Sequence, residues 1–272
     1  MTLGQPPPPA PRASVGRAVG GFFLDLAIAV AVLFAVSMLC GLAWAITQGV
    51  RVATTTVRQG GELDPSVVMA QLGQPGGVAL LLMTLAGTSS AALVVYAWRR
   101  RADASERVAS LQAAKRPATW AWALLAGTTT FVLGIFFSLL GRAAGIELEP
   151  TNLALIEGVR REHPLLLLVF AVVLAPAYEE LLFRRVLFGR LLAAGRPWLG
   201  LVLSSAAFAL LHELPGTSDQ GWSATLLLWL TYGGMGAAFA WVYWRTGTLW
   251  AAIAAHAGNN LVACALLFAG IQ

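Results

Sequence analysis

The chain alternates long apolar runs with short polar segments, and the length of the runs predicts membrane-spanning helices. A helix needs about 20 apolar residues to cross a bilayer, and seven runs approach or exceed that length. The expected spans are Val19–Thr47, Val78–Trp98, Trp120–Leu140, Leu165–Leu182, Trp198–Leu211, Ala224–Trp244 and Leu249–Phe268. The fifth is short by this rule, so we expect it to extend in both directions. The pattern predicts an all-α, polytopic transmembrane helix bundle of about seven spans, with an eighth span or re-entrant segment as the alternative.

The composition supports a membrane protein and argues against a nucleic-acid-binding protein. Of the 272 residues, 58% are hydrophobic and 11% are charged, whereas soluble domains carry about 25% charged residues. The pI near 9.9 is compatible with nucleic-acid binding, but the arginines sit at the ends of apolar runs instead of on one surface. Membrane topology requires that placement, so we exclude nucleic acid as a partner.

Basic residues in the segments between the spans predict how the chain is oriented. Thirteen Lys and Arg residues lie on one side of the seven spans and five on the other. The positive-inside rule then places the N-terminus in the cytoplasm and the C-terminus outside. The Arg-rich, Ala-rich and almost Lys-free composition suggests a high-GC bacterium, so the expected location is the bacterial cytoplasmic (inner) membrane.

The chain divides into three predicted regions. Residues 1–18 form a disordered, Pro-rich cytoplasmic tail. Residues 19–163 form an N-terminal transmembrane region of three spans with their loops, and residues 164–270 contain the last four spans. Those four are rich in small residues such as Gly233, Gly234 and Gly236, which let transmembrane backbones approach closely. We therefore expect the last four spans to form a compact bundle with the first three packed around it.

Three features of the N-terminal region carry further expectations. Asp25 lies near the start of the first run, where we favour an interfacial or helix-paired carboxylate over a catalytic one. The polar segment Arg51–Gly77 is expected to be an external loop. The segment Arg99–Ala118 is expected to be a short basic amphipathic stretch at the inner leaflet, attracted to anionic lipid or acting only as a topology determinant.

The fourth run contains two adjacent carboxylates at membrane depth. Ionised groups there cost several kcal/mol and are by default functional-site candidates. Glu180 and Arg184 are i,i+4 partners, so this pair neutralises itself and supports the bundle. Glu179 has Phe183 at its i+4 position instead and is left without a cation, which makes it our candidate general base.

Two later runs contain histidines with a second motif residue on the same helical face. Phe208 lies four residues before His212, and Asn260 lies four residues after His256. Counted from the turn before the fifth span, Glu179 and His212 both stand about 22–24 Å deep. His256 agrees with this depth less well, because only about 8 residues separate it from the start of its own run.

Other membrane-protease chemistries do not fit the sequence. His212-Glu213 is followed by Leu-Pro-Gly, so the HExxH helix is missing. An aspartyl dyad needs two membrane aspartates, and only Asp25 is available. Ser204 and Ser205 lack a GxSxG-type turn.

Together, Glu179-Glu180-xxx-Arg184, Phe208-xxx-His212 and His256-xxx-Asn260 resemble the three motifs of the CPBP family, the CAAX-processing and bacteriocin-processing (Abi) intramembrane proteases. The resemblance covers about Leu165–Leu267 and makes residues 164–270 the expected catalytic domain.

The resemblance implies endopeptidase activity on membrane-associated protein, lipidated or peptide substrates. Glu179 and His212 would activate a water molecule, and His256 and Asn260 would stabilise the oxyanion, while Glu180, Arg184 and Phe208 give structural support. A metal-free mechanism is favoured because Asn is a poor zinc ligand; the alternative is Zn²⁺ held by Glu179, His212 and His256.

Two other classes of function are alternatives to a protease. A non-catalytic scaffold or bacteriocin-immunity-type protein on the same fold would be indicated by loss of Glu179 or a histidine, and these residues are all present. A transporter with a Glu/His proton relay would show inverted repeats and broken helices in both halves, and the sequence has no such symmetry.

Overall fold

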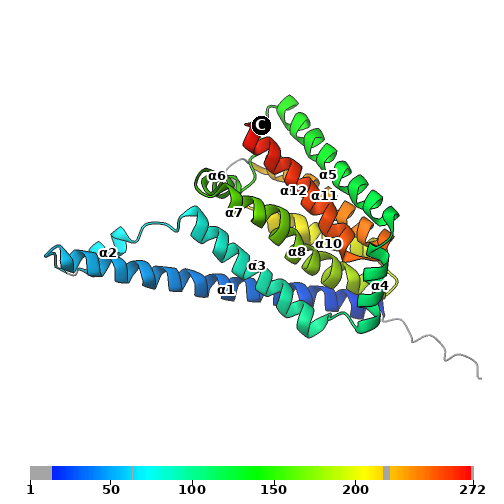
Figure 1. Ribbon diagram of the computed structural model, residues 1–272, viewed down its shortest axis with the longest axis horizontal. Helices are drawn as coiled ribbons and strands as arrows, with labels where there is room; N and C mark the ends of the chain where they lie inside the picture. Colours follow the sequence, from blue (N-terminus) through cyan, green and yellow to red (C-terminus); the bar gives the residue numbers. More distant parts are fainter. Residues whose placement is uncertain (1–13, 63, 217–220, 271–272) are drawn as a thin grey trace, which may run out of the picture.

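Residues 14–62, 64–216 and 221–270 are described by a computed structural model, and all of their regular secondary structure is helical (Figure 1). The helices are α1 (Val15–Arg58), α2 (Pro65–Gln71), α3 (Gly77–Arg99), α4 (Ala104–Ala114), α5 (Pro117–Ala143), α6 (Leu153–Glu162), α7 (Pro164–Val169), the π-helix η1 (Phe170–Leu174), α8 (Ala175–Glu180), the π-helix η2 (Leu181–Phe188), α9 (Gly189–Ala193), α10 (Pro197–His212), α11 (Gly221–Thr246) and α12 (Leu249–Ala269). The predicted all-α polytopic bundle is confirmed.

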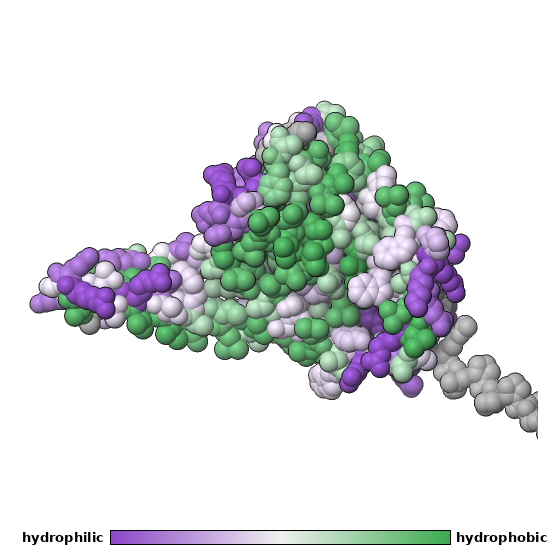
Figure 2. All heavy atoms as spheres, in the orientation of Figure 1, coloured by the Kyte–Doolittle hydropathy of each residue, from purple (hydrophilic) through white to green (hydrophobic). Residues whose placement is uncertain are grey.

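Six helices among the described residues are long and apolar enough to cross a membrane. They are α1, α3, α5, the continuous helix Pro164–Ala193, α11 and α12. Helix α10 is also apolar but has only 16 residues, about 24 Å of helix. It extends the expected fifth span by a single residue in each direction, so it stays shorter than a full crossing requires. Figure 2 shows an apolar band across the molecule, with hydrophilic residues near α2, α4 and α6.

The N-terminal helix is longer than the sequence pattern suggests. Helix α1 has 44 residues, about 66 Å at 1.5 Å per residue, whereas the hydrocarbon core is about 30 Å thick. The helix continues through Arg51–Arg58, so the expectation that this part is loop is wrong. At its other end α1 begins at Val15, and residues 1–13 of the expected tail lie outside the described residues.

Asp25 is paired between helices, as expected. Its carboxylate is fully buried and accepts from Arg99 Nε at 2.5 Å and from Arg190 Nε at 2.7 Å. The contact joins α1 to the end of α3 and to α9. It brings the arginines of two chain segments to the end of the molecule where α1 begins.

The bundle contains the third span as well as the last four. Helix α5 packs on α11 and α12, and α10 packs on α11. Small residues make these contacts possible: a Cβ on Gly127 of α5 would lie 2.9 Å from Ala255 O, and one on Gly236 of α11 would lie 2.9 Å from Ser205 Cα. The close approach of helices expected for the last four spans therefore extends to α5.

Candidate active site

The helix that carries the two glutamates is interrupted by two π-helical stretches. Residues 164–193 form one continuous helix in which η1 and η2 flank α8. In η1 the Ala175 N–H donates to Phe170 O, five residues back. The next such bond would run from residue 176 to Ala171, but Pro176 has no N–H. Ala171 O instead accepts from Asn260 Nδ2 at 2.8 Å. Such π-stretches are frequent at functional sites, and here one leaves a carbonyl free to hold a motif residue.

Glu179 faces both motif histidines. Its Oε2 lies 3.6 Å from His212 Nε2 and 3.9 Å from His256 Nε2. Both distances exceed the 2.7–3.2 Å typical of a direct hydrogen bond. Glu179 Oε2 is buried and has no hydrogen-bond partner among the described residues. The side chain as a whole keeps 18% of its surface exposed, so the carboxylate is reachable.

His212 is oriented by its own helix. Its Nδ1 lies 2.8 Å from Phe208 O, and a carbonyl can only accept, so Nδ1 carries the proton in the neutral ring. Nε2 then has a free lone pair directed at Glu179. The Phe208 ring packs against the imidazole with centroids 4.1 Å apart, and Tyr232 covers the imidazole at 4.7 Å. The Phe208 position of the motif thus supplies both a carbonyl and a packing surface.

His256 is oriented by the second glutamate. Its Nδ1 lies 2.9 Å from Glu180 Oε1, and Phe239 stacks on the ring with centroids 4.8 Å apart. Glu180 Oε2 in turn lies 2.8 Å from Arg184 Nε. Glu180 and Arg184 have no exposed surface at all. The Glu180 carboxylate therefore balances the buried Arg184 guanidinium and fixes the orientation of the His256 ring.

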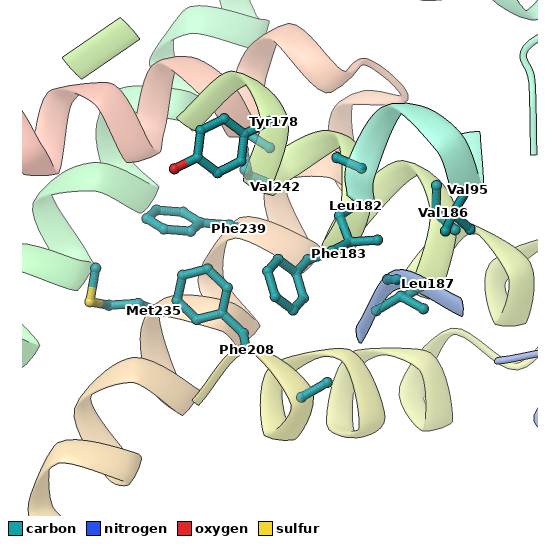
Figure 3. Close-up of a cluster of buried hydrophobic side chains, with 14 of the residues drawn as sticks. Val95, Tyr178, Leu182, Phe183, Val186, Leu187, Phe208, Met235, Phe239 and Val242 are labelled. Carbon is teal, nitrogen blue, oxygen red and sulfur yellow. The ribbon is translucent and has the colours of Figure 1, made fainter. Parts of the chain in front are cut away.

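Aromatic rings surround the buried guanidinium. The Cζ atom of Arg184 lies 4.7 Å from the ring centroid of Phe208, 5.3 Å from that of Phe239 and 5.7 Å from that of Phe183. Figure 3 shows these three rings converging from η2, α10 and α11. Cation–π contact of this kind strengthens when the cation is desolvated. The rings thus surround Arg184 where water is excluded.

Asn260 is held by a chain of hydrogen bonds that starts in α5. The Thr130 hydroxyl shares its hydrogen between Gly127 O of its own helix at 2.8 Å and Asn259 Oδ1 at 3.1 Å, and Asn259 Nδ2 donates to Asn260 Oδ1 at 3.3 Å. Asn260 Nδ2 donates one hydrogen to Ala171 O, which leaves its second hydrogen for another acceptor. The chain links α5, α12 and η1 and fixes which way the Asn260 amide points.

A cavity of about 690 Å³ connects these groups to the membrane-facing helices. Glu179, His212, His256 and Asn260 all line it, and most of its remaining wall is apolar and comes from α1, α3, α6 and the helix containing residues 164–193. Near one end Thr151 N–H donates to Glu213 Oε1 at 2.9 Å. This bond ties the segment before α6 to the residue that follows His212, at the C-terminal end of α10.

No group of three or more His, Cys, Asp or Glu side chains within residues 14–62, 64–216 and 221–270 is placed to hold a metal ion. The two Nε2 atoms lie 3.6 and 3.9 Å from Glu179 Oε2, and the reaction proposed below is written with these side chains alone.

The structure brings all seven predicted site residues to one place, but sequence reasoning missed four others. Tyr232, Phe239, Asn259 and Thr130 contact the motif residues directly or through one another. Asn259 is the one that the sequence signals, because it is a second amide beside Asn260 in an apolar run. Tyr232, Phe239 and Thr130 lie in spans without a motif, so only the packing of α5 and α11 identifies them.

The fold and the site define a class: a polytopic α-helical membrane protein with a partly buried Glu–His–His–Asn cluster. Residues 161–262 match the family model of Rce1-like, type II CAAX prenyl endopeptidases. A curated relative, the putative membrane peptidase YdiL of Bacillus subtilis (strain 168), is 32% identical over 130 residues, which are 48% of this chain and 48% of that protein. The matched region thus spans about half the length of the curated relative. No solved structure gives a significant match. The predicted resemblance to the CPBP family of membrane proteases is confirmed for this segment.

Proposed function

We propose that this protein is an intramembrane endopeptidase that hydrolyses peptide bonds of membrane-associated proteins or peptides. The observation that carries the proposal is the position of Glu179 Oε2, which faces the Nε2 atoms of His212 and His256 at 3.6 and 3.9 Å inside a largely apolar cavity. A carboxylate without a hydrogen-bond partner is costly in such surroundings. A water molecule there would gain two acceptors, the carboxylate and the His212 lone pair, at the point where a general base is needed.

In the first step of the proposed reaction, the Glu179 carboxylate and the His212 lone pair both accept hydrogen bonds from the water molecule. The water oxygen attacks the carbonyl carbon of the scissile bond, and its proton passes to Glu179. The carbonyl oxygen becomes an oxyanion in the tetrahedral intermediate. Collapse of the intermediate breaks the C–N bond, and the proton held by Glu179 goes to the leaving amine. His212 acts by holding the water in line.

The oxyanion is proposed to be stabilised by the other two motif residues. Asn260 has one amide hydrogen left after its bond to Ala171 O, and His256 directs Nε2 into the site because Nδ1 is held by Glu180. To donate from Nε2, the His256 ring would carry both protons, and the carboxylates of Glu180 and Glu179 together would offset the charges of that ring and of Arg184. Each donor of this type is worth about 3–4 kcal/mol in other hydrolases.

The proposed orientation places the N-terminus and the basic ends of the helices in the cytoplasm of a bacterial inner membrane. The bond between Asp25 and both Arg99 and Arg190 brings basic ends of α3 and α9 beside the start of α1. One face of the molecule therefore holds basic residues from separate segments, as the positive-inside rule requires of the cytoplasmic side.

Membrane proteomics tests the activity and identifies substrates in one experiment. Cells that produce the wild-type protein are compared with cells that produce the Glu179→Gln variant at equal level. We expect membrane-associated proteins to accumulate as full-length forms only with the variant, with matching fragments only in the wild type. Identical profiles in the two strains would favour a non-catalytic scaffold.

Metal analysis of the purified protein, with a chelator control on cleavage, tests the proposed independence from zinc.

Thr130 tests whether the amide chain positions Asn260. In Thr130→Val the hydroxyl that donates to Asn259 Oδ1 is lost at nearly constant volume. We expect kcat to fall on the order of tenfold because a misplaced oxyanion donor is costly, while KM stays within about twofold. The matched control is Thr129→Val, since that exposed hydroxyl only bonds Leu125 O of its own helix. Equal kcat in the two variants would remove the positioning role.

A further inference from the structure

A partly buried cluster of arginines lies at the end of the molecule where α1 begins and α3 ends. Asp25 accepts hydrogen bonds from Arg99 and Arg190. Glu106 of α4 accepts from both terminal nitrogens of Arg185, at 3.1 Å and 2.5 Å. Two carboxylates thus accept hydrogen bonds from three arginines, which come from α3, η2 and α9.

Arg100 is a fourth arginine in the same place, and it forms no salt bridge within the described part of the chain. Its Nη2 donates to Gly189 O at 3.2 Å. Its Nε is buried and has no hydrogen-bond partner among the described residues, and the same is true of Arg185 Nε. Burial lowers the pKa of Arg100, and the nearby charges of Arg185 and Arg190 lower it further. The guanidinium is therefore desolvated, and the repulsion from Arg185 and Arg190 is offset only in part by the attraction of Glu106 and Asp25.

The cluster has an excess of about two positive charges that an anion would balance. Charges removed from water are normally paired, and an unpartnered buried donor calls for a missing ion or water. A guanidinium with a free Nε–H suits a phosphate, whose oxygens it binds in a fork geometry.

The position of Arg100 favours a lipid as the source of that phosphate. Arg100 directly follows the membrane-spanning helix α3, and Trp98 beside it is 73% exposed, as expected for an interfacial tryptophan. Leu93 of α3, seven residues before Arg100, is 55% exposed. An acyl chain could follow the surface of α3 there while the head group reaches Arg100.

We propose that this arginine cluster is a binding site for the phosphate of an anionic phospholipid of the cytoplasmic leaflet, with Arg100 as the principal ligand and Arg185 beside it. The site is separate from the Glu179 cluster. It does not depend on the protease activity. It gives the basic α3–α4 segment a specific ligand in addition to its effect on topology.

Thermal unfolding in lipid nanodiscs tests the site with two neighbouring arginines. The test variant is Arg100→Gln, and the matched control is Arg101→Gln, which removes the same charge from an exposed position outside the salt bridges of the described residues. Replacing phosphatidylcholine in part by phosphatidylglycerol is expected to raise the Tm of the wild type and of Arg101→Gln by about 5 °C. Arg100→Gln should show no rise. In pure phosphatidylcholine its Tm should stay close to that of the wild type, because relief of the repulsion by Arg185 and Arg190 offsets the lost bond to Gly189 O and the lost attraction to Asp25 and Glu106.

In this thermal measurement, an equal rise in Tm for Arg100→Gln, or no rise in the wild type, would overturn the proposal. Inorganic phosphate added to phosphatidylcholine nanodiscs is expected to leave the Tm unchanged. A rise in Tm as large as that produced by phosphatidylglycerol would point to a soluble anion instead of a lipid.

Native mass spectrometry of the wild type gives an independent measurement that needs no variant. We expect phosphatidylglycerol to be retained at least about tenfold over phosphatidylcholine from an equal mixture, as a lipid-specific basic pocket would require, and equal retention would contradict a specific site.

Discussion

Replacing Glu179 with glutamine is expected to lower proteolysis by about 10²–10⁴-fold, the contribution typical of a general base. Glutamine has nearly the shape of glutamate but cannot take a proton from water. Glu179 Oε2 has no hydrogen-bond partner among the described residues, so the substitution removes no hydrogen bond at that atom. The loss should therefore fall on kcat, while the thermal unfolding curve stays close to that of the wild type.

The measurement uses purified protein in proteoliposomes with a substrate found by membrane proteomics. The matched control is Glu162→Gln, which changes an exposed carboxylate just before the same helix and should keep full activity. Unimpaired cleavage by well-folded Glu179→Gln protein would remove Glu179 from the role of base and would reopen the assignment of the whole cluster. A variant that loses activity together with its fold would instead assign Glu179 a structural role.

The sequence alone predicts which residues meet at this site, because helical spacing converts directly into depth and face. The residue count places Glu179 and His212 at matching depth, and their side chains approach to 3.6 Å. His256 agrees less well with the depth count, yet its Nε2 lies 3.9 Å from the same Glu179 oxygen. The count assumes regular α-helices at equal tilt, whereas the chain around Glu179 contains two π-stretches that change both rise and direction.

The supporting contacts could not be predicted in the same way. The Thr130 hydroxyl reaches Asn259 only because Gly127 lets α5 approach the backbone of α12. A single chain of apolar runs does not reveal which helices become neighbours. The same limit applies to Phe239, whose position in α11 is typical of ordinary core until the packing places it on His256.

Helix ends were the least predictable part of the fold. Helix α1 continues through Arg51–Arg58, since threonines and valines there are compatible with a helix and no proline or glycine interrupts it. Helix α10 ends at His212 because Glu213 adopts an extended conformation and is held by Thr151 and Trp229. That irregular backbone borders the cavity inside the protein, where its polar groups are satisfied. Pro215 and Gly216 signal the end of α10 in the sequence, whereas the tertiary contacts that hold Glu213 leave no local signal.

Replacing Arg184 with methionine is expected to destabilise the protein by about 3–5 kcal/mol, the cost of breaking a buried ion pair by removing one partner. Arg184 and Glu180 are both fully buried, and Arg184 Nε lies 2.8 Å from Glu180 Oε2. Methionine fills much of the space among the phenylalanine rings, so the loss arises chiefly from the Glu180 charge that is left uncompensated. Thermal or denaturant unfolding in detergent measures the change, and Arg142→Met, at an exposed helix end, should shift stability by no more than about 0.5 kcal/mol.

The double variant Glu180→Gln/Arg184→Met separates charge from packing. Removing both charges avoids the uncompensated carboxylate, and the amide oxygen of the introduced glutamine can still accept the bond from His256 Nδ1 that Glu180 Oε1 accepts in the wild type. We expect the double variant to regain at least about 2 kcal/mol over Arg184→Met alone, since neutral replacement of buried ion pairs is often tolerated. If the double variant is as unstable as the single one, Arg184 is held by its aromatic neighbours and not by Glu180. Residual cleavage by a well-folded double variant would show that Glu180 and Arg184 support the site, whereas complete loss with the fold retained would assign the pair a direct part in the chemistry.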